Sequence, residues 1–515
     1  METIQEKTYR RSLEVDPVRR LTQKKIEDIH SKSCELLNDP GITCFSQKVS
    51  EIYRQAGCKT EEKEPGTSWT VRIPEEVVAG ALKTVPSRIV LGARDPENAL
   101  LLDAEKPHVY FGTGSETNIF LESRLESFRS EQNPEHKITY PVYHEARGNV
   151  ARLALSARLC NELENIDFFI RNVNLQDEGI TEDNKDVNVF FASLLFMTKH
   201  VQAGITNIDK LDDVLKMARI IAGGEEALRE NPLISFIACP IKSPLQMVED
   251  TAEKVVEIVQ TGLPLVLSSS PQGGSTAPVQ EEGIVAQINA EILANIVLTQ
   301  AVKPGAPVLY GAVPVRARTD NLHDFYGAPE FIHYNMDCAQ MARYYGVPCY
   351  SSAGVGDAKR PGIQAMMEKV PVQMGVASAG PQYIHYAVGL LDRTNIFSPL
   401  QAVLDDASLG LIKDILRRPR FNEENTEEAV QEIRKVTASS GIFARYMRKQ
   451  LRRGVVSEPY AFADDEVADT VLEQAQERLD EITADTGEML PQEKIDRLYR
   501  ELPGLLDLNR FIKTE

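Results

Sequence analysis

The feature that most constrains the fold of this chain is a series of eight short apolar runs that begins at residue 108. The runs are His108–Gly112, Ile166–Ile170, His200–Ile205, Leu233–Ala238, Leu263–Ser269, Pro307–Val313, Val347–Ala353 and Gln382–Val388. A strand, a helix and two loops together occupy just over about 30 residues, so this spacing is typical of repeated βα units. Eight units predict an α/β protein with a (β/α)8 TIM barrel, and a doubly wound open sheet is the alternative.

The segments between the runs carry helix signals. Apolar residues recur at helical spacing from Val248 to Val259, and we interpret Ser243-Pro244 as the N-cap and first-turn proline of this helix. The tripeptides at 262–264 and 346–348 place a glycine at a helix end and lead directly into the next strand. Ile284–Val302 is predicted to be a long apolar helix that carries one acid, Glu291. Glu291 is either a buried acid with a functional role or, without such a role, a residue that forms a salt bridge or faces water.

The barrel leaves sequence on both sides. At about 150 residues per domain, 515 residues suggest three domains, but a barrel absorbs ~250 residues or more. We predict an N-terminal helical and mixed segment at 1–104, a TIM-barrel domain at 105–400 and a C-terminal helical extension at 401–515. The first segment contains helical patterns at Leu21–Leu37 and Pro74–Lys83.

Composition excludes several classes of protein. The 57 basic and 76 acidic residues give a net charge of −19, which is poorly suited to a nucleic acid or an anionic membrane surface. The sequence has neither an apolar run long enough to span a membrane nor an apolar stretch at its start. Its seven cysteines are scattered without a C-x-x-C pair, and its eight histidines form no short ligand motif. We therefore expect a cytoplasmic protein without a bound metal.

The residues that end the predicted strands mark the expected site, because barrel enzymes place their active sites there. These ends are rich in glycine, hydroxyl groups and tyrosine, and no serine–histidine or cysteine–histidine pair is evident among them. Gln272–Thr276 opens a helix and is either an anion-binding turn or simply a tight turn, since it lacks the lysine of a phosphate loop. A basic stripe further along, which either docks an acidic partner or is a solvated face, consists of Arg445, Arg448, Lys449, Arg452 and Arg453.

From the fifth to the seventh run, a series of motifs occurs in a characteristic order. The motifs are Gly-Gly-Ser-Thr-Ala-Pro-Val (273–279), Asn-Ala-Glu (289–291), Gly-Ala-Pro-Val-Leu-Tyr-Gly (305–311), Gly-Ala-Pro-Glu (327–330), Tyr-Tyr-Gly-Val-Pro (344–348), Gly-Asp-Ala-Lys (356–359) and the stretch 364–369. In this order they resemble the trimethylamine methyltransferase (MttB) superfamily of corrinoid-dependent methyltransferases. The resemblance covers roughly residues 20–440 and is densest from 263 to 370.

The resemblance implies a TIM-barrel methyltransferase (EC 2.1.1) that passes a methyl group to the Co(I) corrinoid of a partner corrinoid protein. Archaeal trimethylamine members carry pyrrolysine, and this sequence contains no such residue. It therefore resembles the branch that acts on quaternary amines such as glycine betaine, proline betaine, carnitine or γ-butyrobetaine. Such a substrate leaves as a neutral tertiary amine, so a site without an acid–base pair is consistent with the reaction.

The resemblance also implies roles for particular residues. A quaternary ammonium group is held by aromatic faces, for which Tyr110, Phe111, Tyr310 and Tyr350 at strand ends are candidates, although core packing explains any one of them equally well. Phe325 and Tyr326 lie in a following loop. The glycine-rich residues expected to face the corrinoid are Gly112, Gly114, Gly273, Gly274, Ser275, Gly356 and Asp357.

One departure from the family pattern concerns the substrate carboxylate. Relatives often read Asp-x-Arg-Thr where this chain has Arg316-Ala317-Arg318-Thr319, so Arg318 corresponds to the shared arginine and Arg316 replaces an acid. Arg316 is either the carboxylate ligand of a betaine or a surface charge.

Two other functions stay open from the sequence. A lyase or aldolase barrel usually shows a lysine or a set of metal ligands at the strand ends, where Lys359 is the one lysine and belongs to the family motif. A non-enzymatic betaine-binding module is the second alternative. For the methyltransferase we expect a homo-oligomer that binds a quaternary amine as its small-molecule substrate.

Overall fold

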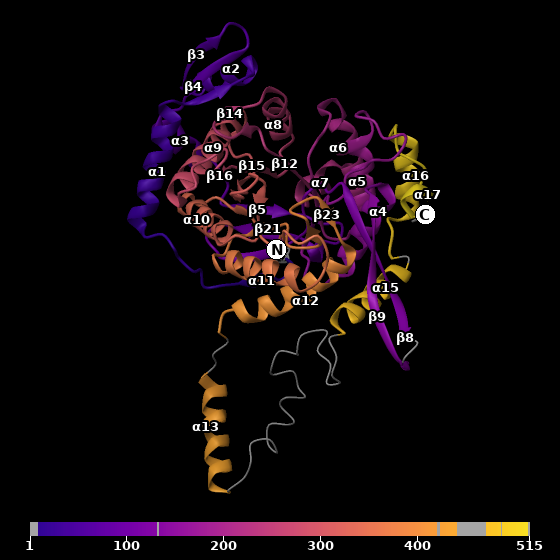
Figure 1. Cartoon of the computed structure of the whole chain (residues 1–515). Coiled ribbons are helices and arrows are strands. Elements are labelled where there is room, and N and C mark those ends of the chain that lie inside the picture. Colours follow the sequence, from indigo (N-terminus) through magenta and orange to yellow (C-terminus); the bar gives the residue numbers. More distant parts are fainter. Residues whose placement is uncertain (1–8, 131–132, 420–422, 440–469, 486, 513–515) are drawn as a thin grey trace, which may run out of the picture.

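The protein is an α/β protein built around one curled parallel sheet (Figure 1). The computed structural model describes residues 9–130, 133–419, 423–439, 470–485 and 487–512. Every one of the eight predicted runs contains a strand of this sheet. The strands are β7 (His108–Phe111), β10 (Phe168–Ile170), β11 (His200–Ala203), β12 (Ile234–Ala238), β15 (Leu265–Ser269), β17 (Val308–Ala312), β20 (Cys349–Ser352) and β21 (Tyr383–His385).

The strands pair in the order in which they occur along the chain, all in parallel, from β10 to β21, and β21 pairs with β7. Gly112 forms a parallel bridge with Phe168, which joins the strands at the two ends of this order, β7 and β10. A doubly wound sheet reverses its strand order at a switch point, so the observed order argues against that alternative.

A helix follows each strand and covers the outside of the sheet. These helices are α4 (Val150–Glu162), α5 (Lys185–Phe196), α6 (Leu211–Ala222), α8 (Glu249–Thr261), α9 (Glu281–Val302), α10 (Pro329–Tyr345), α11 (Ile363–Ser378) and α12 (Pro399–Leu416). Gly262 and Gly346 end α8 and α10 in the left-handed conformation, as the sequence predicts.

The predicted start of α8 is wrong. Val248, not Ser243, occupies the N-cap position, and Ser243-Pro244 is a cis peptide in the preceding loop. The hydroxyl of Ser243 donates a hydrogen bond to Glu291 of α9 instead of capping a helix. The intervening residues form two short strands, β13 (Ile241–Lys242) and β14 (Gln246–Met247), and β14 pairs with the N-terminal β2 (Ile42–Cys44).

The N-terminal elements cover α9 on the side away from the sheet. Ser33 and Tyr53 donate hydrogen bonds to carbonyl groups of this helix, and α1 and α3 pack against it. α9 is long and apolar enough to cross a membrane, but 94% of the relevant stretch is buried inside the protein. β1 (Leu13–Glu14) pairs antiparallel with β7 at the edge of the curled sheet. The other elements that come before β7 in the chain are α1 (Gln23–Asn38), α2 (Gln47–Gln55), β3 (Lys59–Glu64), β4 (Ser68–Arg72), α3 (Glu75–Leu82), β5 (Arg88–Leu91), the 3-10 turn at Pro96–Asn98 and β6 (Leu100–Asp103).

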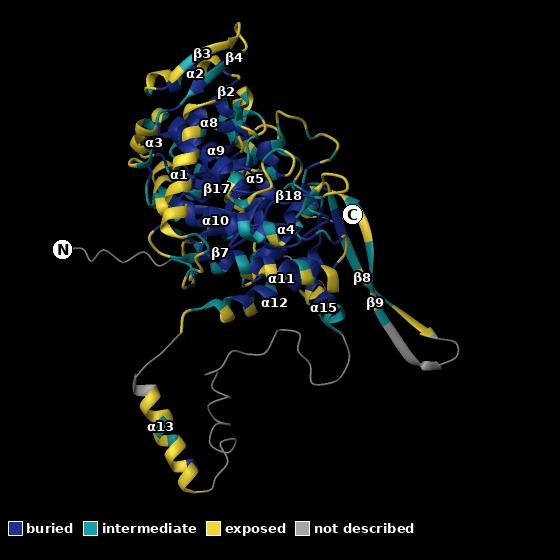
Figure 2. Cartoon of the chain, turned by 60° about the vertical axis from the view of Figure 1, so that its left-hand side comes forward, coloured by how far each residue is buried: buried dark blue, intermediate teal, exposed yellow. Residues whose placement is uncertain are grey.

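A long hairpin occupies the widest gap between the predicted runs and was not expected from the sequence. β8 (Ile119–Ser130) and β9 (Asn133–Arg147) pair antiparallel and project from the body as an arm (Figures 1 and 2). The base of the arm pairs with β23 (Ile396–Phe397), which itself pairs with β22 (Leu390–Leu391).

Beyond α12 the described residues are helical, as predicted. α13 (Glu423–Ala438) stands apart from the body in both views, whereas α15 (Val471–Ala484) packs against the arm and α12. α16 (Gln492–Glu501) and α17 (Asn509–Ile512) pack against α6 and α4, and a six-residue helix, α7 (Glu225–Glu230), follows α6. The basic stripe from Arg445 to Arg453 lies outside the described residues, and α12 spans the predicted domain boundary at residue 400.

Candidate functional site

Loops after the carboxyl ends of the strands enclose a cavity of about 390 Å³, which we call the mouth. Its lining residues come from the loops that follow β15, β17 and β21. They are Gln272, Leu322, His323, Asp324, Asp392, Arg393, Thr394 and Asn395. Small extra strands shape this region: β16 (Gln272–Gly273) pairs with β18 (Val315–Ala317), and β18 pairs with β19 (Asp324–Phe325).

Backbone strain is concentrated at the same end of the sheet. Among the described residues, the non-glycine residues with positive φ all lie in loops that follow the carboxyl end of a strand. They are Ser115, Leu245, Leu322, Tyr386, Asp392 and Arg393. Three of them line the mouth. Such strain persists where the surrounding structure enforces it, and it is typical of ligand sites.

Stacked aromatic rings lie at the carboxyl ends of β20 and β21. The ring of His385 stacks on Tyr350, with centroids 4.1 Å apart, and lies 3.6 Å from the ring of Tyr386. Burial lowers the pKa of His385 well below its ordinary value, so the imidazole is neutral at physiological pH. Neither ring nitrogen has a hydrogen-bond partner among the described residues. This cluster therefore presents uncharged aromatic surface.

A carboxylate adjoins this aromatic cluster. Gln272 donates a hydrogen bond of 2.7 Å to Asp324, and Tyr326 is also hydrogen-bonded to it. Burial raises the pKa of Asp324, although the hydrogen bond from Gln272 and the charge of Arg393 oppose the shift. The charge on Asp324 acts on both Tyr326 and Tyr386, so these three side chains lie within electrostatic reach of one another. Asp324, which lines the mouth, therefore lies beside the aromatic cluster.

Cys239 follows β12 and is the exposed one of the seven cysteines, all of which the structure describes. It lies within electrostatic range of Tyr350 and Tyr386. The surrounding protein raises the pKa of this thiol to about 11 by burial, so the thiol is protonated at neutral pH. Cys239 is thus a neutral wall residue and not a thiolate nucleophile.

Glu291 is fully buried, which decides between the two interpretations of this acid. Burial raises its pKa, and its carboxylate accepts hydrogen bonds from the side chains of Ser243, Ser269 and Gln287 and from the backbone of Leu245. Ser269 is the last residue of β15. Glu291 therefore holds the loop after β12 against the end of the neighbouring strand, and it supports the site without lining the mouth.

The four aromatic residues predicted at strand ends divide between the two faces of the sheet. Tyr350 and Tyr110 belong to the cluster inside the sheet, whereas Phe111 and Tyr310 belong to the cluster between the sheet and its helices. The hydroxyl of Tyr110 donates to the carbonyl of Arg10 near the amino end of β7, and that of Tyr310 donates to Asn289 of α9. Tyr350 is therefore the one of the four that reaches the aromatic cluster, and the substrate-binding roles of all four stay predictions.

Arg316 and Asp324 lie on opposite faces of the small β18–β19 ribbon. Arg316 is paired with Phe325 and Ala317 with Asp324, and residues directly opposite each other point to the same face. The guanidinium of Arg316 lies 5.0 Å from the Phe325 ring and 3.7 Å from the carboxylate of Glu330 in α10. The role of Arg316 in carboxylate recognition stays a prediction, and Arg393 is the arginine that lines the mouth.

The residues predicted to face the corrinoid have packing or turn roles in this structure. A Cβ on Gly112 would lie 2.2 Å from the Phe168 ring, and one on Gly114 would lie 2.8 Å from Tyr386. Gly273, Gly274 and Ser275 form the turn after β15, in which Gln272 accepts backbone hydrogen bonds. Gly356 precedes Asp357, whose carboxylate accepts from the backbone of Gly327 at 2.8 Å. Contact with a corrinoid stays a prediction for all seven.

Several residues in or beside the mouth are not predicted from the sequence: Asp324 and Arg393 line it, and His385 and Tyr386 belong to the adjoining aromatic cluster. The strand-end rule applied to the eighth run, 382–388, points to His385 and Tyr386. Asp324 and Arg393 lie in long loops, where sequence alone gives no spacing rule. Among the described residues, no group of three or more His, Cys, Asp or Glu side chains is placed to hold a metal ion.

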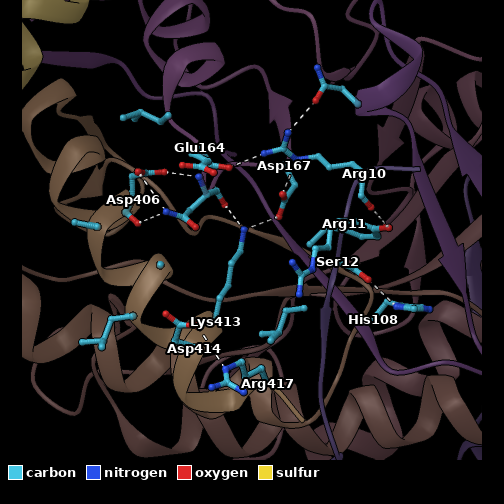
Figure 3. Close-up of a pocket in the computed structure, with 18 of the residues that line it drawn as sticks. Arg10, Arg11, Ser12, His108, Glu164, Asp167, Asp406, Lys413, Asp414 and Arg417 are labelled. Carbon is cyan, nitrogen blue, oxygen red and sulfur yellow. Dashed lines mark hydrogen bonds and ion pairs between the residues drawn. The ribbon is translucent and has the colours of Figure 1, made fainter. Parts of the chain in front are cut away.

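A second cavity, of about 1840 Å³, lies at the opposite end of the sheet, beside the amino ends of β7 and β10 (Figure 3). Several of its charged side chains are paired with one another. Asp167 accepts hydrogen bonds from Arg10 at 2.8 Å and from the backbone of Phe111, and Lys413 lies 3.4 Å away. These contacts fasten the N-terminal segment and α12 to the sheet.

A parallel sheet with its helices outside and an uncharged aromatic cluster at its carboxyl ends defines an α/β protein of the kind that binds and transforms small molecules. The sequence pattern of the trimethylamine methyltransferase (MTTB) family matches residues 2–121 and 139–446. The chain belongs to this family and is a methyltransferase of the EC 2.1.1 class. The unmatched stretch 122–138 lies within the arm.

Individual relatives include two named trimethylamine methyltransferase MttB. The protein from Desulfitobacterium hafniense (strain DSM 10664 / DCB-2) is 31% identical over 396 residues, which cover 76% of this chain and 74% of the relative. The one from Methanosarcina barkeri is 29% identical over 84% of this chain and 82% of the relative.

A glycine betaine methyltransferase from D. hafniense (strain Y51) is 24% identical over 78% of both chains. Among solved structures, the N-acetylneuraminate lyase from Mycoplasma synoviae is similar with a TM-score of 0.27 and 10% identity, over 72% of this chain and 96% of the lyase chain.

Proposed function

We propose that this protein transfers a methyl group from a quaternary amine of the betaine class to the Co(I) corrinoid of a partner corrinoid protein. Family membership supports methyl transfer. Relatives named for trimethylamine and for glycine betaine support an N-methylated amine as the methyl donor. The observation that carries the choice of a cation is the neutral aromatic cluster, which adjoins Asp324, one of the two carboxylates that line the mouth.

A quaternary ammonium group suits this surface. Its methyl groups carry the positive charge outward and cannot donate ordinary hydrogen bonds, so recognition depends on aromatic faces and a nearby negative charge. Tyr350, Tyr386 and Tyr326 supply the rings, and Asp324 supplies the charge. His385 stays neutral beside them and so does not repel the cation.

A carboxylate at the other end of the substrate fits Arg393. This guanidinium lines the mouth together with Asp324, and Asp392 lies 3.2 Å from it. The positive φ of both Asp392 and Arg393 fixes an unusual backbone at this position. A zwitterion with its ammonium group at Asp324 and its carboxylate at Arg393 pairs with two of the three charged residues that line the mouth, the third being Asp392.

The reaction requires little acid–base catalysis from the protein. As the C–N bond breaks, the nitrogen keeps the bonding electron pair and becomes a neutral tertiary amine, so no proton is needed. The corrinoid of the partner supplies the electron pair that forms the new bond to the methyl carbon. The side chains of this protein orient the amine and exclude water, which accords with a protonated Cys239 and a neutral His385 in the wall.

The proposal also covers the fold, the cellular location and the oligomeric state of the protein. We take the curled sheet to be a complete (β/α)8 barrel, since the bridge between Gly112 and Phe168 joins its end strands. The same proposal has a cytoplasmic enzyme that assembles as a homo-oligomer, binds neither nucleic acid nor membrane, and uses the partner's corrinoid as methyl acceptor without a metal of its own.

The proposal is tested by methyl transfer with defined components. The purified protein is mixed with a Co(I) corrinoid protein and, separately, glycine betaine, proline betaine, carnitine, γ-butyrobetaine, choline and trimethylamine, while the Co(I) absorbance is followed. We expect methyl-Co(III) to form with at least one carboxylate-bearing quaternary amine. No reaction with any quaternary amine, under conditions where a known relative reacts, rejects the proposal. Binding of a betaine without turnover supports a binding module instead.

The two arginines give a matched pair of variants. We expect Arg393→Ala to lower kcat/KM for the reactive betaine about tenfold or more, because a charge-assisted hydrogen bond is lost, and to affect choline little. Arg316 lies on the other face of β18–β19 from Asp324. Arg316→Ala should therefore change the ratio of kcat/KM for the betaine to kcat/KM for choline by less than about twofold. If Arg316→Ala changes the ratio and Arg393→Ala does not, Arg316 is the carboxylate ligand.

A further inference from the structure

The outward face of α11 carries no charged side chain, which is unusual for a surface helix of a protein in which 26% of residues are charged. Its exposed positions are Ile363, Gln364, Met367, Pro371 and Met374. Ile363 and Met367 are 76% and 72% exposed and exceed every other exposed large hydrophobic residue of the described chain. On α1, by contrast, Lys24, Lys25, Glu27, Asp28, Lys32 and Glu35 are all exposed.

Both charged residues of α11 are turned inward. Glu368 accepts hydrogen bonds from the backbone of Asp357 at 2.7 Å and of Ala358 at 3.0 Å. Lys369 is completely buried and forms an ion pair of 3.1 Å with Asp405 of α12. The helix therefore uses its charges to hold neighbouring loops, and the residues that it exposes to solvent are uncharged. Figure 2 shows exposed positions along α11. Exposed apolar patches of this kind mark interaction surfaces.

The loop that precedes α11 adjoins the mouth, because the backbone amides of Asp392 and Arg393 donate hydrogen bonds to the carbonyls of Ala358 and Gly356. The carboxylate of Asp357 accepts from the backbone of Gly327, in the loop that follows β17, while its own backbone is held by Glu368 of α11. The loop after β17 also carries Leu322, which lines the mouth and is 57% exposed. We call the surface formed by Leu322, Ile363, Met367 and Met374 the apolar rim. It begins at the mouth and runs along the helix that leaves it.

We propose that the apolar rim is the surface on which the corrinoid-carrying partner docks. This inference rests on the proposed function, because only a partner that delivers its reactive centre to the mouth must cover the surface beside it. The α11 part of the rim begins next to the mouth, because the loop that precedes α11 is hydrogen-bonded to Asp392 and Arg393 of the mouth lining. Two of its four residues are methionines, whose flexible side chains adapt to a partner that binds and leaves repeatedly.

A second copy of this chain is the competing occupant, and α12 provides the matched control. Ile415 is 58% exposed in the last turn of α12. Because α12 follows β21 and runs back along the sheet, this residue lies near the amino ends of the strands, whereas Ile363 begins α11 at the mouth. Ile363→Glu and Ile415→Glu therefore place the same charge on the same residue type at opposite ends of the molecule.

The test compares two methyl acceptors. Transfer from the reactive betaine is measured to a Co(I) corrinoid protein and to cob(I)alamin free in solution, for the unmodified protein, the double variant Ile363→Glu/Met367→Glu and the control Ile415→Glu. We expect the double variant to raise the KM for the corrinoid protein about tenfold or more, since a charge is placed in an apolar interface. Its rate with free cob(I)alamin should stay within about twofold, and Ile415→Glu should change neither value.

Each contrary result has a distinct meaning. Unchanged KM for the corrinoid protein in the double variant overturns the docking surface. Equal losses with both acceptors overturn it as well, because the damage then lies in the mouth. A shift to a smaller assembly in sedimentation, with normal transfer, assigns the rim to a second copy. If the unmodified protein transfers methyl to neither acceptor from any amine, the proposed function itself fails and the inference falls with it.

Discussion

The two ends of the curled sheet treat their polar groups in opposite ways. At the amino end, the cavity of about 1840 Å³ contains charges that are paired: Arg10 and Lys413 neutralise Asp167 (Figure 3). At the carboxyl end, the mouth has about 390 Å³. Beside it, the His385 nitrogens lack partners among the described residues. The larger cavity therefore belongs to the structural frame of the protein, whereas polar groups without partners and strained backbone mark the functional site.

The contrast has a physical basis. A buried polar group without a partner costs free energy, and folding alone gives no reason to keep it. At the amino end Asp167 is satisfied by the protein itself, so this network stabilises the fold. At the carboxyl end, polar groups without partners lower the stability of the fold but are available to bind a ligand. Substitutions at the amino end should therefore change stability alone, and substitutions in the mouth should change activity.

The largest effect is expected beneath the mouth, at the ion pair between Lys369 and Asp405. Both side chains are fully buried, and Lys369 also donates to the carbonyls of Gly354, in the loop after β20, and Leu390, in β22. Lys369→Met leaves an uncompensated buried carboxylate and should lower the free energy of unfolding by about 3–5 kcal/mol. Urea denaturation measures this change.

The double variant Lys369→Met/Asp405→Leu separates charge from packing. It removes both members of the pair, so it should recover much of the lost stability. Stability that stays as low as in the single variant would show that the hydrogen bonds to the loops matter more than the charge pair. If the single variant loses less than about 1 kcal/mol of stability, the ion pair between Lys369 and Asp405 does not contribute strongly to the fold.

The comparison between the ends is tested most directly by Asp324 and Arg10. Asp324→Asn keeps the shape of the side chain and removes its charge, so kcat/KM for a quaternary amine should fall about 10- to 100-fold. Arg10→Ala removes an ion pair to the buried Asp167 and should lower the free energy of unfolding by about 1–3 kcal/mol, with kcat/KM unchanged. Initial rates and urea denaturation are measured for both variants. The reverse pattern would place the site at the amino end.

The pH dependence of activity provides a second test of Asp324. Burial raises its pKa, so its protonation on acidification begins above the ordinary aspartate value of about 3.9. Protonation removes the charge that attracts the cation, and kcat/KM should therefore fall as the pH falls through that range. Asp324→Asn should lack this acidic limb. An unchanged limb in the variant would assign the titration to another group.

The sequence predicts the frame of this molecule better than its site. The eight apolar runs contain all eight strands, because strand position follows from local apolar patterning and from the length of a βα unit. The prediction that Ser243-Pro244 starts a helix is wrong because the hydroxyl of Ser243 donates a hydrogen bond to Glu291, 48 residues away along the chain. Phe111 and Tyr310 show a second limit: the sequence places an aromatic residue at a strand end, but the register of the sheet decides which face it occupies. Asp324 and Arg393 meet through long loops, which follow no periodic pattern.

An effect on stability that depends on pH and leaves activity unchanged is expected at the amino end, where Lys199 is buried and donates to the carbonyls of Cys160 and Leu163. Burial, reinforced by the charge of Arg10, lowers its pKa to about 7. Between this value and the unfolded value of about 10.4, the unfolded chain binds a proton that the folded chain does not. Stability from this group therefore rises with pH across that window, by at most about 1.4 kcal/mol per pH unit, and is lost as the pH falls toward 7.

Lys199→Met removes this contribution, so its stability relative to the unmodified protein should be greater at pH 7 than at pH 9. Lys24→Met, an exposed lysine on α1, is the control and should show no such difference. Urea denaturation at the two pH values measures both variants, and kcat/KM should stay unchanged in each. A stability difference independent of pH would mean that Lys199 keeps its proton when folded. The amino end would then carry a buried charge that its partners Cys160 and Leu163 fully compensate, which would strengthen the contrast with the unpaired groups at the mouth.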